Sequence, residues 1–217
     1  MMIYLSNYYY GRRQAAPLQN LPIKFMSTKL ILIRHGQTDW SKQKKYCGVR
    51  DIDLNDVGRH QAEKLENELI NKDIINVYSS DLKRCENFAK LIFKNKLIEK
   101  LPQLREMNFG IFEGLTYHQL MEKHQEIYQR WLNNPSKISI PQGENLNEMN
   151  IRVKKTLMQL LCINKDKTIA MITHGGPIKV ILCHVLNLNL DEIWQIEPGL
   201  ASVREIEFDE TGKGKIL

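Results

Sequence analysis

The sequence lacks any uninterrupted apolar run of the roughly 20 residues that a membrane-spanning helix requires. It is also poor in cysteine: Cys47, Cys85, Cys162 and Cys183 form no C-x-x-C pair, and their spacings match no zinc site. Because Cys85, Cys162 and Cys183 lie in apolar stretches of helical character, we interpret them as small buried side chains in a reducing cytosol. We therefore expect a soluble, cytoplasmic protein with no metal site and no membrane partner.

A dense basic stripe, a low-complexity segment and an internal repeat are also absent. The formal net charge is +6, and Arg12, Arg13 and Lys24, in an acid-free stretch over residues 1–25, account for +3 of it. The dispersed +3 that remains disfavours nucleic acid as a partner and suits a small anionic substrate. The pattern leaves open whether the chain forms a homodimer.

Residues 1–26 show neither helical nor strand periodicity. Arg12 and Arg13 are not followed by an apolar stretch, which disfavours a secretory signal. We therefore expect this segment to be a dispensable, poorly ordered N-terminal extension. No further stretch has the composition of a linker, so residues 27–217 are predicted to form one domain.

From Lys29 onward, short apolar runs alternate with amphipathic segments, which is typical of βαβ units and a parallel sheet. The predicted strands are residues 29–33, 74–80, 167–173 and 202–208, with a short one at 97–101. The predicted helices follow Asn55, Asp81 and Thr116, cover residues 149–161, and run from Pro177 to about Asn187. The pattern therefore predicts an α/β fold, a three-layer αβα sandwich around a mostly parallel sheet.

Three of the predicted strands end on residues that carry chemistry. The first is followed by Arg34 and His35, the second by a Ser-Ser-Asp run with Arg84 in the next helix, and the third by His174 and Gly175. Ligands of parallel sheets bind beyond the carboxyl ends of the strands. We therefore expect the two histidines and two arginines to converge on one rim.

Such a rim suits a phosphate dianion. Two guanidinium groups offer fork-shaped contacts to phosphate oxygens. A neutral imidazole is a competent nucleophile toward phosphorus, and a second imidazole can hydrogen-bond the group in transfer. Fixed cations stabilise the charge that develops during displacement, so we expect neither a metal nor another cofactor.

Five segments, in this order, resemble the signature of the histidine phosphatase superfamily, also called the phosphoglycerate mutase-like family: LIRHGQTDW, GVRDIDLNDVGRHQA, SSDLKRC, LREMNFGIFEG and ITHGG. The resemblance covers residues 29 to about 205. It implies a phosphoglycerate mutase-like fold with a small helical cap inserted at about residues 107–142. We expect this cap to determine the substrate.

The resemblance also implies the roles of five side chains. His35 would be the nucleophile that carries a phosphohistidine. Arg34, Arg84 and His174 would clamp the phosphoryl group. Glu106 would be the general acid that protonates the leaving oxygen and then the base that activates water.

Further residues of the matched segments are candidates for substrate binding: Thr38, Ser41, Gly48, Gly175 and Glu113. Glu113 is also the rival of Glu106 for the acid role. Ser41 departs from the family, which commonly has Asn there, so its contact with phosphate stays open. Glu144, in a Gly-Glu-Asn run, belongs either to a helix cap or to the pocket.

The function implied is metal-independent hydrolysis of a small phosphorylated metabolite. The chain lacks the Arg-His-Tyr-Gly-like run and the longer insertion of cofactor-dependent mutases. Residues 109–120 and 131–149 are similar to bacterial α-ribazole-5′-phosphate phosphatases of cobalamin biosynthesis, which favours α-ribazole 5′-phosphate as substrate. Phosphoserine phosphatase, broad-specificity phosphatase, phosphoglycerate mutase and a catalytically silent phospho-ligand binding module remain alternatives.

Overall fold

The computed structural model describes residues 27–217, and the extension predicted at residues 1–26 lies outside the described part. Its centre is a six-stranded sheet in the order β3-β2-β4-β1-β5-β6. The strands are β1 (Thr28–Arg34), β2 (Ile74–Ser79), β3 (Ile98–Lys100), β4 (Thr168–Thr173), β5 (Val203–Phe208) and β6 (Gly214–Ile216). The pairs β3-β2, β2-β4 and β4-β1 are parallel, and β5 and β6 are antiparallel additions at one edge.

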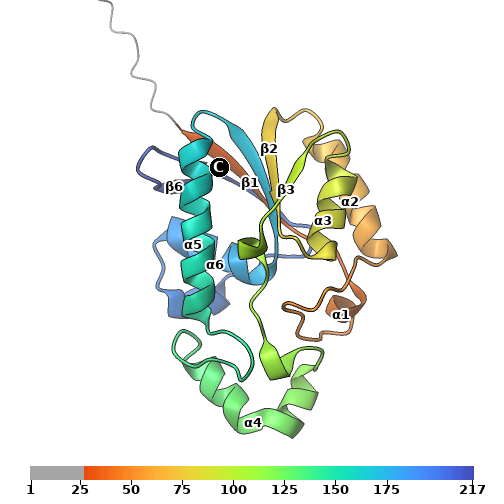
Figure 1. The fold of residues 1–217 in the computed structure, drawn as a ribbon, viewed down its shortest axis with the longest axis vertical. Coiled ribbons are helices and arrows are strands. Elements are labelled where there is room, and N and C mark those ends of the chain that lie inside the picture. The colour runs from red at the N-terminus through yellow and green to blue at the C-terminus, as the bar shows by residue number, and fades with distance from the viewer. Residues whose placement is uncertain (1–26) are drawn as a thin grey trace, which may run out of the picture.

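Helices cover both faces of the sheet, as the sequence predicts (Figure 1). On one face lie α2 (Asp56–Leu69) and α3 (Lys83–Ile92), and on the other lie α5 (Leu146–Ile163) and α6 (Gly175–Leu186). The Asn55 side chain accepts a hydrogen bond from the Gly58 amide at 3.0 Å and so caps α2 as expected. The predicted three-layer αβα sandwich is confirmed.

The apolar run of β1 is continuous because this strand is buried on both faces. Leu30 and Leu32 belong to the core beneath α5 and α6, whereas Ile31 and Ile33 belong to the core beneath α2 and α3. Each of the four is at most 1% exposed. Burying such a side chain stabilises the fold by about 1.5–3 kcal/mol, so β1 is a rigid support for whatever follows it.

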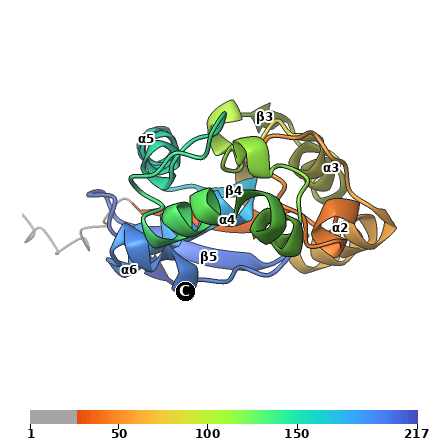
Figure 2. The ribbon, with the colours of Figure 1, turned by 90° about the horizontal axis from the view of Figure 1, so that it is seen from below.

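The predicted cap segment holds α4 (Tyr117–Asn133) and a short 3₁₀ helix, η2 (Gly110–Phe112). Thr116 caps α4, and a non-helical backbone at His124 kinks it. Figures 1 and 2 show α4 beyond the end of the sheet where β1 leads into α1 (Asp39–Lys42). Two further 3₁₀ helices are η1 (Pro102–Leu104) and η3 (Leu190–Gln195).

The cysteines are all free, but their predicted burial holds only in part. Cys85 and Cys183 are buried, whereas Cys162 is exposed. The prediction for Cys162 was wrong because α5 turns Leu160 and Leu161 toward the core and the next position outward. Over residues 27–217, no helix is both long and apolar enough to cross a membrane.

Candidate functional site

The site lies where β2, β4 and β1 end side by side. Arg34 is in register with Thr173, and the His35 amide donates to the Thr173 carbonyl at 3.0 Å. On the other side, the Ser80 amide donates to the Ile172 carbonyl at 2.9 Å. The three strands therefore end at one level, and the side chains that follow them face one region.

The two imidazoles from distant parts of the chain meet at this edge. The rings of His35 and His174 lie edge to face, with centroids 5.1 Å apart. His35 is 6% exposed and His174 is fully buried. The structure thus brings together the two histidines that the sequence placed at separate strand ends.

The surroundings of His35 define its chemical state. Nδ1 lies 2.7 Å from the Gly36 carbonyl oxygen, which can only accept, so Nδ1 carries the proton. Burial, and then the cations of Arg84 and Arg34, hold the pKa of His35 well below its usual range. The ring is therefore neutral near pH 7, and the lone pair on Nε2 is available for nucleophilic attack.

His174 and Arg84 form a second layer behind His35. Arg84 Nε donates to His174 Nδ1 at 3.1 Å, which leaves His174 Nε2 to donate to the Ser80 hydroxyl at 2.9 Å. The Arg84 Nη groups donate to the Gly48 and Arg50 carbonyls at 2.6 and 2.8 Å. Burial and Arg84 lower the pKa of His174 well below its usual range. Neither His174 nor Arg84 is among the residues that line the adjacent cavity.

Arg34, in contrast, reaches that cavity. Its Nη1 donates to the Pro198 carbonyl at 2.6 Å, and its Nε is buried with no hydrogen-bond partner among residues 27–217. The guanidinium packs over Gly175, whose absent Cβ would lie 3.4 Å from Cζ. A buried, unpaired guanidinium donor beside a cavity is suited to an anion.

Glu106 also lines the cavity and is 8% exposed. The Gly176 amide donates to both carboxyl oxygens, at 3.0 and 3.1 Å, and the Met107 amide donates to Oε1 at 2.9 Å. The first turn of α6 therefore holds this carboxyl. A Cβ at Gly176 would lie 2.1 Å from Oε1, so only glycine permits the approach.

Glu113, the rival carboxylate, lies outside the cavity lining. Its oxygens accept from the amides of Gly48 and Val49 at 3.0 and 2.9 Å. Glu113 and Gly48 therefore tie the loop after β1 to the cap segment. Of the two carboxylates, only Glu106 faces a space where a substrate fits.

The cavity has a volume of about 690 Å³, and Thr38, Ser41 and Gly175 line it as well. The Ser41 hydroxyl donates to the Thr38 carbonyl and accepts from the Thr38 amide, both at 2.9 Å. The Ser41 oxygen therefore belongs to the capping box of α1, and its single proton goes to the Thr38 carbonyl, whereas an Asn side chain would offer two amide protons.

Sequence reasoning missed most of the cavity wall. The basic lining residues besides Arg34 are Lys44, Lys45 and Lys179, and the acidic ones are Glu106 and Glu197. Four cations against two carboxylates favour an anionic ligand. Within residues 27–217, no group of three or more His, Cys, Asp or Glu side chains is placed to hold a metal ion.

The chain is similar to known proteins over most of its length. The sequence model of the histidine phosphatase superfamily (branch 1) matches residues 30–216. Phosphoserine phosphatase 1 of Hydrogenobacter thermophilus is 32% identical over 84% of this chain and 87% of its own length.

Two solved structures share the fold. Phosphoserine phosphatase from Entamoeba histolytica, in complex with 3-phosphoglyceric acid, is 26% identical with a TM-score of 0.78, covering 87% of this chain and 94% of that one. The α-ribazole phosphatase from Shigella flexneri is 24% identical with a TM-score of 0.79, over the same shares of the two chains. At 24% identity, the second likeness bears on the fold alone.

Proposed function

Because the chain belongs to the histidine phosphatase superfamily, we propose that it hydrolyses a small phosphate monoester through a phosphohistidine on His35. One observation carries the proposal. The hydrogen bond from His35 Nδ1 to the Gly36 carbonyl leaves Nε2 unprotonated in the wall of a cationic cavity. Arg34 and Glu106 line that same cavity.

In the first step, the lone pair on His35 Nε2 attacks phosphorus and forms the P–N bond. The P–O bond to the leaving oxygen breaks, and Glu106 in its acid form gives that oxygen a proton, so the product leaves as an alcohol. Glu106 suits this role because it lines the cavity while its backbone neighbours fix the carboxyl.

In the second step, water attacks the phosphohistidine. The Glu106 carboxylate takes a proton from that water, the P–N bond breaks, and inorganic phosphate leaves. His35 returns to its neutral form with Nδ1 still bonded to the Gly36 carbonyl. The net reaction consumes one phosphate monoester and one water and yields one alcohol and one phosphate.

Fixed positive charge lowers the barrier to both steps in this proposal. Arg34 contacts the transferring group directly, and its unpaired Nε supports that role. Arg84 and His174 act from the layer behind His35, where Arg84 orients the His174 ring and contributes its charge. These groups supply the electrostatic stabilisation for which other phosphatases use a metal.

For the substrate, we favour a phosphate ester that carries a carboxylate, such as phosphoserine. Lys44, Lys45 and Lys179 give the cavity more positive charge than one phosphate requires. A relative named phosphoserine phosphatase, at 32% identity, supports this class. α-Ribazole 5′-phosphate is the second candidate, because Tyr46, Tyr117 and Trp194 also line the cavity and suit a flat ring.

The test is a panel of phosphoserine, phosphoethanolamine, α-ribazole 5′-phosphate and 3-phosphoglycerate, assayed with EDTA. Phosphoethanolamine is the matched control because it keeps the ester and amine of phosphoserine but lacks the carboxylate. We expect phosphate release in EDTA, fastest from phosphoserine. Phosphate transfer between phosphoglycerates would favour a mutase, and binding without release would favour a silent module.

We place the reaction in the cytoplasm as part of this proposal. All four cysteines are free thiols, and two of them are buried, which is typical of proteins from a reducing compartment.

A further inference from the structure

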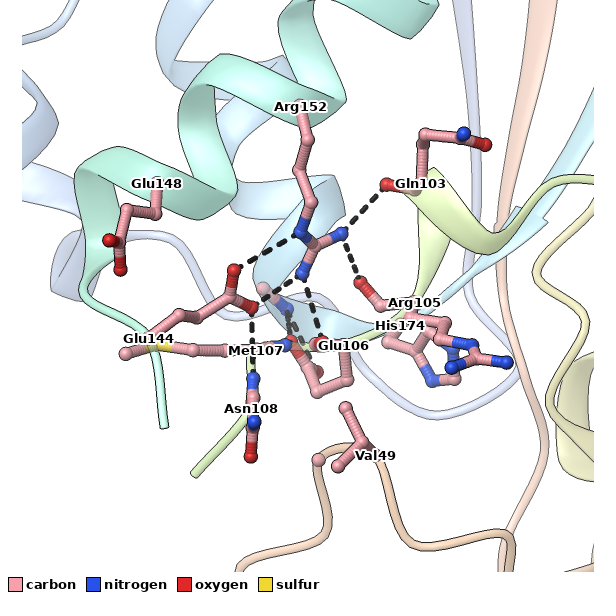
Figure 3. Close-up of polar contacts among 12 residues, drawn as sticks. Val49, Gln103, Arg105, Glu106, Met107, Asn108, Glu144, Glu148, Arg152 and His174 are labelled. Atoms are coloured by element: carbon pink, nitrogen blue, oxygen red, sulfur yellow. Dashed lines mark hydrogen bonds and ion pairs between the residues drawn. The ribbon is translucent and has the colours of Figure 1, made fainter. Parts of the chain in front are cut away.

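Arg152, on α5, reaches out of its helix to the segment that carries Glu106 (Figure 3). Its Nη1 donates to the carbonyls of Gln103 and Arg105, both at 2.7 Å. Its Nη2 donates to the carbonyl of Glu106 itself at 3.0 Å. One guanidinium therefore binds the backbone oxygens of Gln103, Arg105 and Glu106, on both sides of the Glu106 side chain.

Glu144 completes the arrangement on the C-terminal side. Its Oε1 accepts from Arg152 Nη2 at 2.7 Å and from the Asn108 amide at 2.9 Å, and its Oε2 accepts from Arg152 Nε at 3.2 Å. The Glu144 amide in turn donates to the Asn108 carbonyl at 3.0 Å. Figure 3 shows both side chains converging on the stretch from Gln103 to Asn108.

The backbone around Glu106 depends on these hydrogen bonds because it has no regular secondary structure. Residues 105–109 belong to no helix or strand, so their backbone groups lack the partners that regular structure provides. The hydrogen bonds from Arg152 and to Glu144 supply partners at three of these residues: the carbonyls of Arg105 and Glu106 and the amide of Asn108. Glu106 thus sits on irregular backbone that is fixed from α5.

We propose that Arg152 and Glu144 are a positioning pair, which holds the Glu106 carboxyl within reach of the leaving-group oxygen. The inference rests on the proposed function, since it assumes that Glu106 transfers a proton. Displacing a reacting group by about 1 Å costs on the order of a hundredfold in rate, so backbone anchoring of this kind has a catalytic consequence.

The contacts indicate that the pair acts by fixing the backbone around Glu106, more than by the attraction between its two charges. The Arg152 and Glu144 side chains are 23% and 18% exposed, and an ion pair near solvent contributes little by itself. Three of the Arg152 hydrogen bonds go to carbonyl oxygens, which a lysine with one ammonium group cannot reach together. Arg152→Lys should therefore keep the positive charge but lose most of the contribution that Arg152 makes to phosphoserine turnover.

The test compares two kinds of leaving group. Phosphoserine needs a proton on its departing oxygen, whereas nitrophenyl phosphate does not, because nitrophenolate is a stable anion. For Arg152→Met and Glu144→Gln, we expect kcat/KM to fall about 10–100-fold on phosphoserine and less than about threefold on nitrophenyl phosphate. Added guanidinium ion should partly restore phosphoserine turnover to Arg152→Ala.

Glu86→Gln is the matched control, because the Glu86 side chain on α3 is also 18% exposed and is ion-paired with Lys90 and Lys100, but makes no hydrogen bond to residues 103–108. It should leave both rates unchanged. Equal losses on the two substrates in Arg152→Met and Glu144→Gln would reduce the pair to a structural role and overturn the inference, as would unchanged phosphoserine turnover. A wild-type protein inert on every ester would instead overturn the proposed function.

Discussion

The rings of His174 and His35 meet edge to face at a centroid distance of 5.1 Å, and both imidazoles are uncharged near pH 7. Their pKa values lie well below the usual range because burial and the Arg84 cation disfavour a further positive charge. The site therefore combines neutral imidazoles with guanidinium groups. A neutral imidazole can act as the nucleophile, while the guanidinium groups beside it supply fixed positive charge.

The same pKa shifts predict how stability depends on pH. In the unfolded chain, histidine takes up a proton near pH 6.5, whereas the buried rings of His35 and His174 do not. Lowering the pH below about 6.5 should therefore reduce the free energy of unfolding, by up to about 1.4 kcal/mol per pH unit for each histidine. Urea unfolding at several pH values between 7.5 and 5 measures this slope.

His174→Gln should make that slope shallower, because one of the two buried rings is then absent. His60→Gln serves as the control, since His60 lies on the surface of α2 with a side chain 66% exposed. A slope that is unchanged by His174→Gln would show that this ring titrates normally in the folded protein.

Glu106→Gln should affect substrates according to their leaving groups. The amide keeps the size of the side chain but has no proton to give, so turnover of phosphoserine should fall about 100-fold or more. Nitrophenyl phosphate, which needs no proton on its leaving group, should lose much less in the first step. Burst kinetics separates that step from hydrolysis of the phosphohistidine. Equal loss of the burst rate on both substrates would remove Glu106 from the acid role.

Lys179 should contribute to the preference for a carboxylate in the substrate. It lines the cavity, and its ammonium lies 5.2 Å from the centre of the Trp194 ring. Lys179→Gln should reduce the ratio of kcat/KM for phosphoserine over phosphoethanolamine about tenfold, the size expected for one charged hydrogen bond. Lys155→Gln, on the exposed side of α5, is the control. An unchanged ratio in Lys179→Gln would assign carboxylate recognition to other residues.

Gly48 tests how tightly the loop after β1 is held against the cap segment. A Cβ at Gly48 would lie 2.0 Å from the Met107 carbonyl and 2.3 Å from Glu113 Oε1. Gly48→Ala should therefore destabilise the protein by about 1–3 kcal/mol in urea unfolding, because backbone has to move. Gly199→Ala, where a Cβ meets no atom within 4 Å, should have little effect on stability. Equal stability of the two variants would contradict the close packing.

Much of the fold was predictable because burial and capping leave strong local patterns. The apolar run of β1 and the Asn55 cap of α2 both appear where the sequence places them. The edge strand β6 was missed, because its three residues begin with glycine and it is held by backbone pairing to β5. The kink of α4 at His124 has no proline or glycine to mark it.

The residues of the site also fall into those that the sequence predicted and those that it did not. His35 and His174 were found because strand ends in a parallel sheet converge, which is a rule of topology. Lys179 and Arg152 were not found, since each lies within a helix whose apolar residues dominate the pattern. The capping role of the Ser41 hydroxyl depends on a local backbone geometry that a motif comparison does not reveal.

The most direct measurement is to trap the covalent intermediate. The wild-type protein would turn over a radiolabelled phosphate monoester in EDTA, be quenched in alkali during the reaction, and be mapped by peptide sequencing. We predict an acid-labile, alkali-stable label on the peptide that contains His35, and none in His35→Ala, whose turnover should fall at least about a thousandfold. A label on another residue, or near-normal turnover by His35→Ala, would contradict a phosphohistidine mechanism at this site.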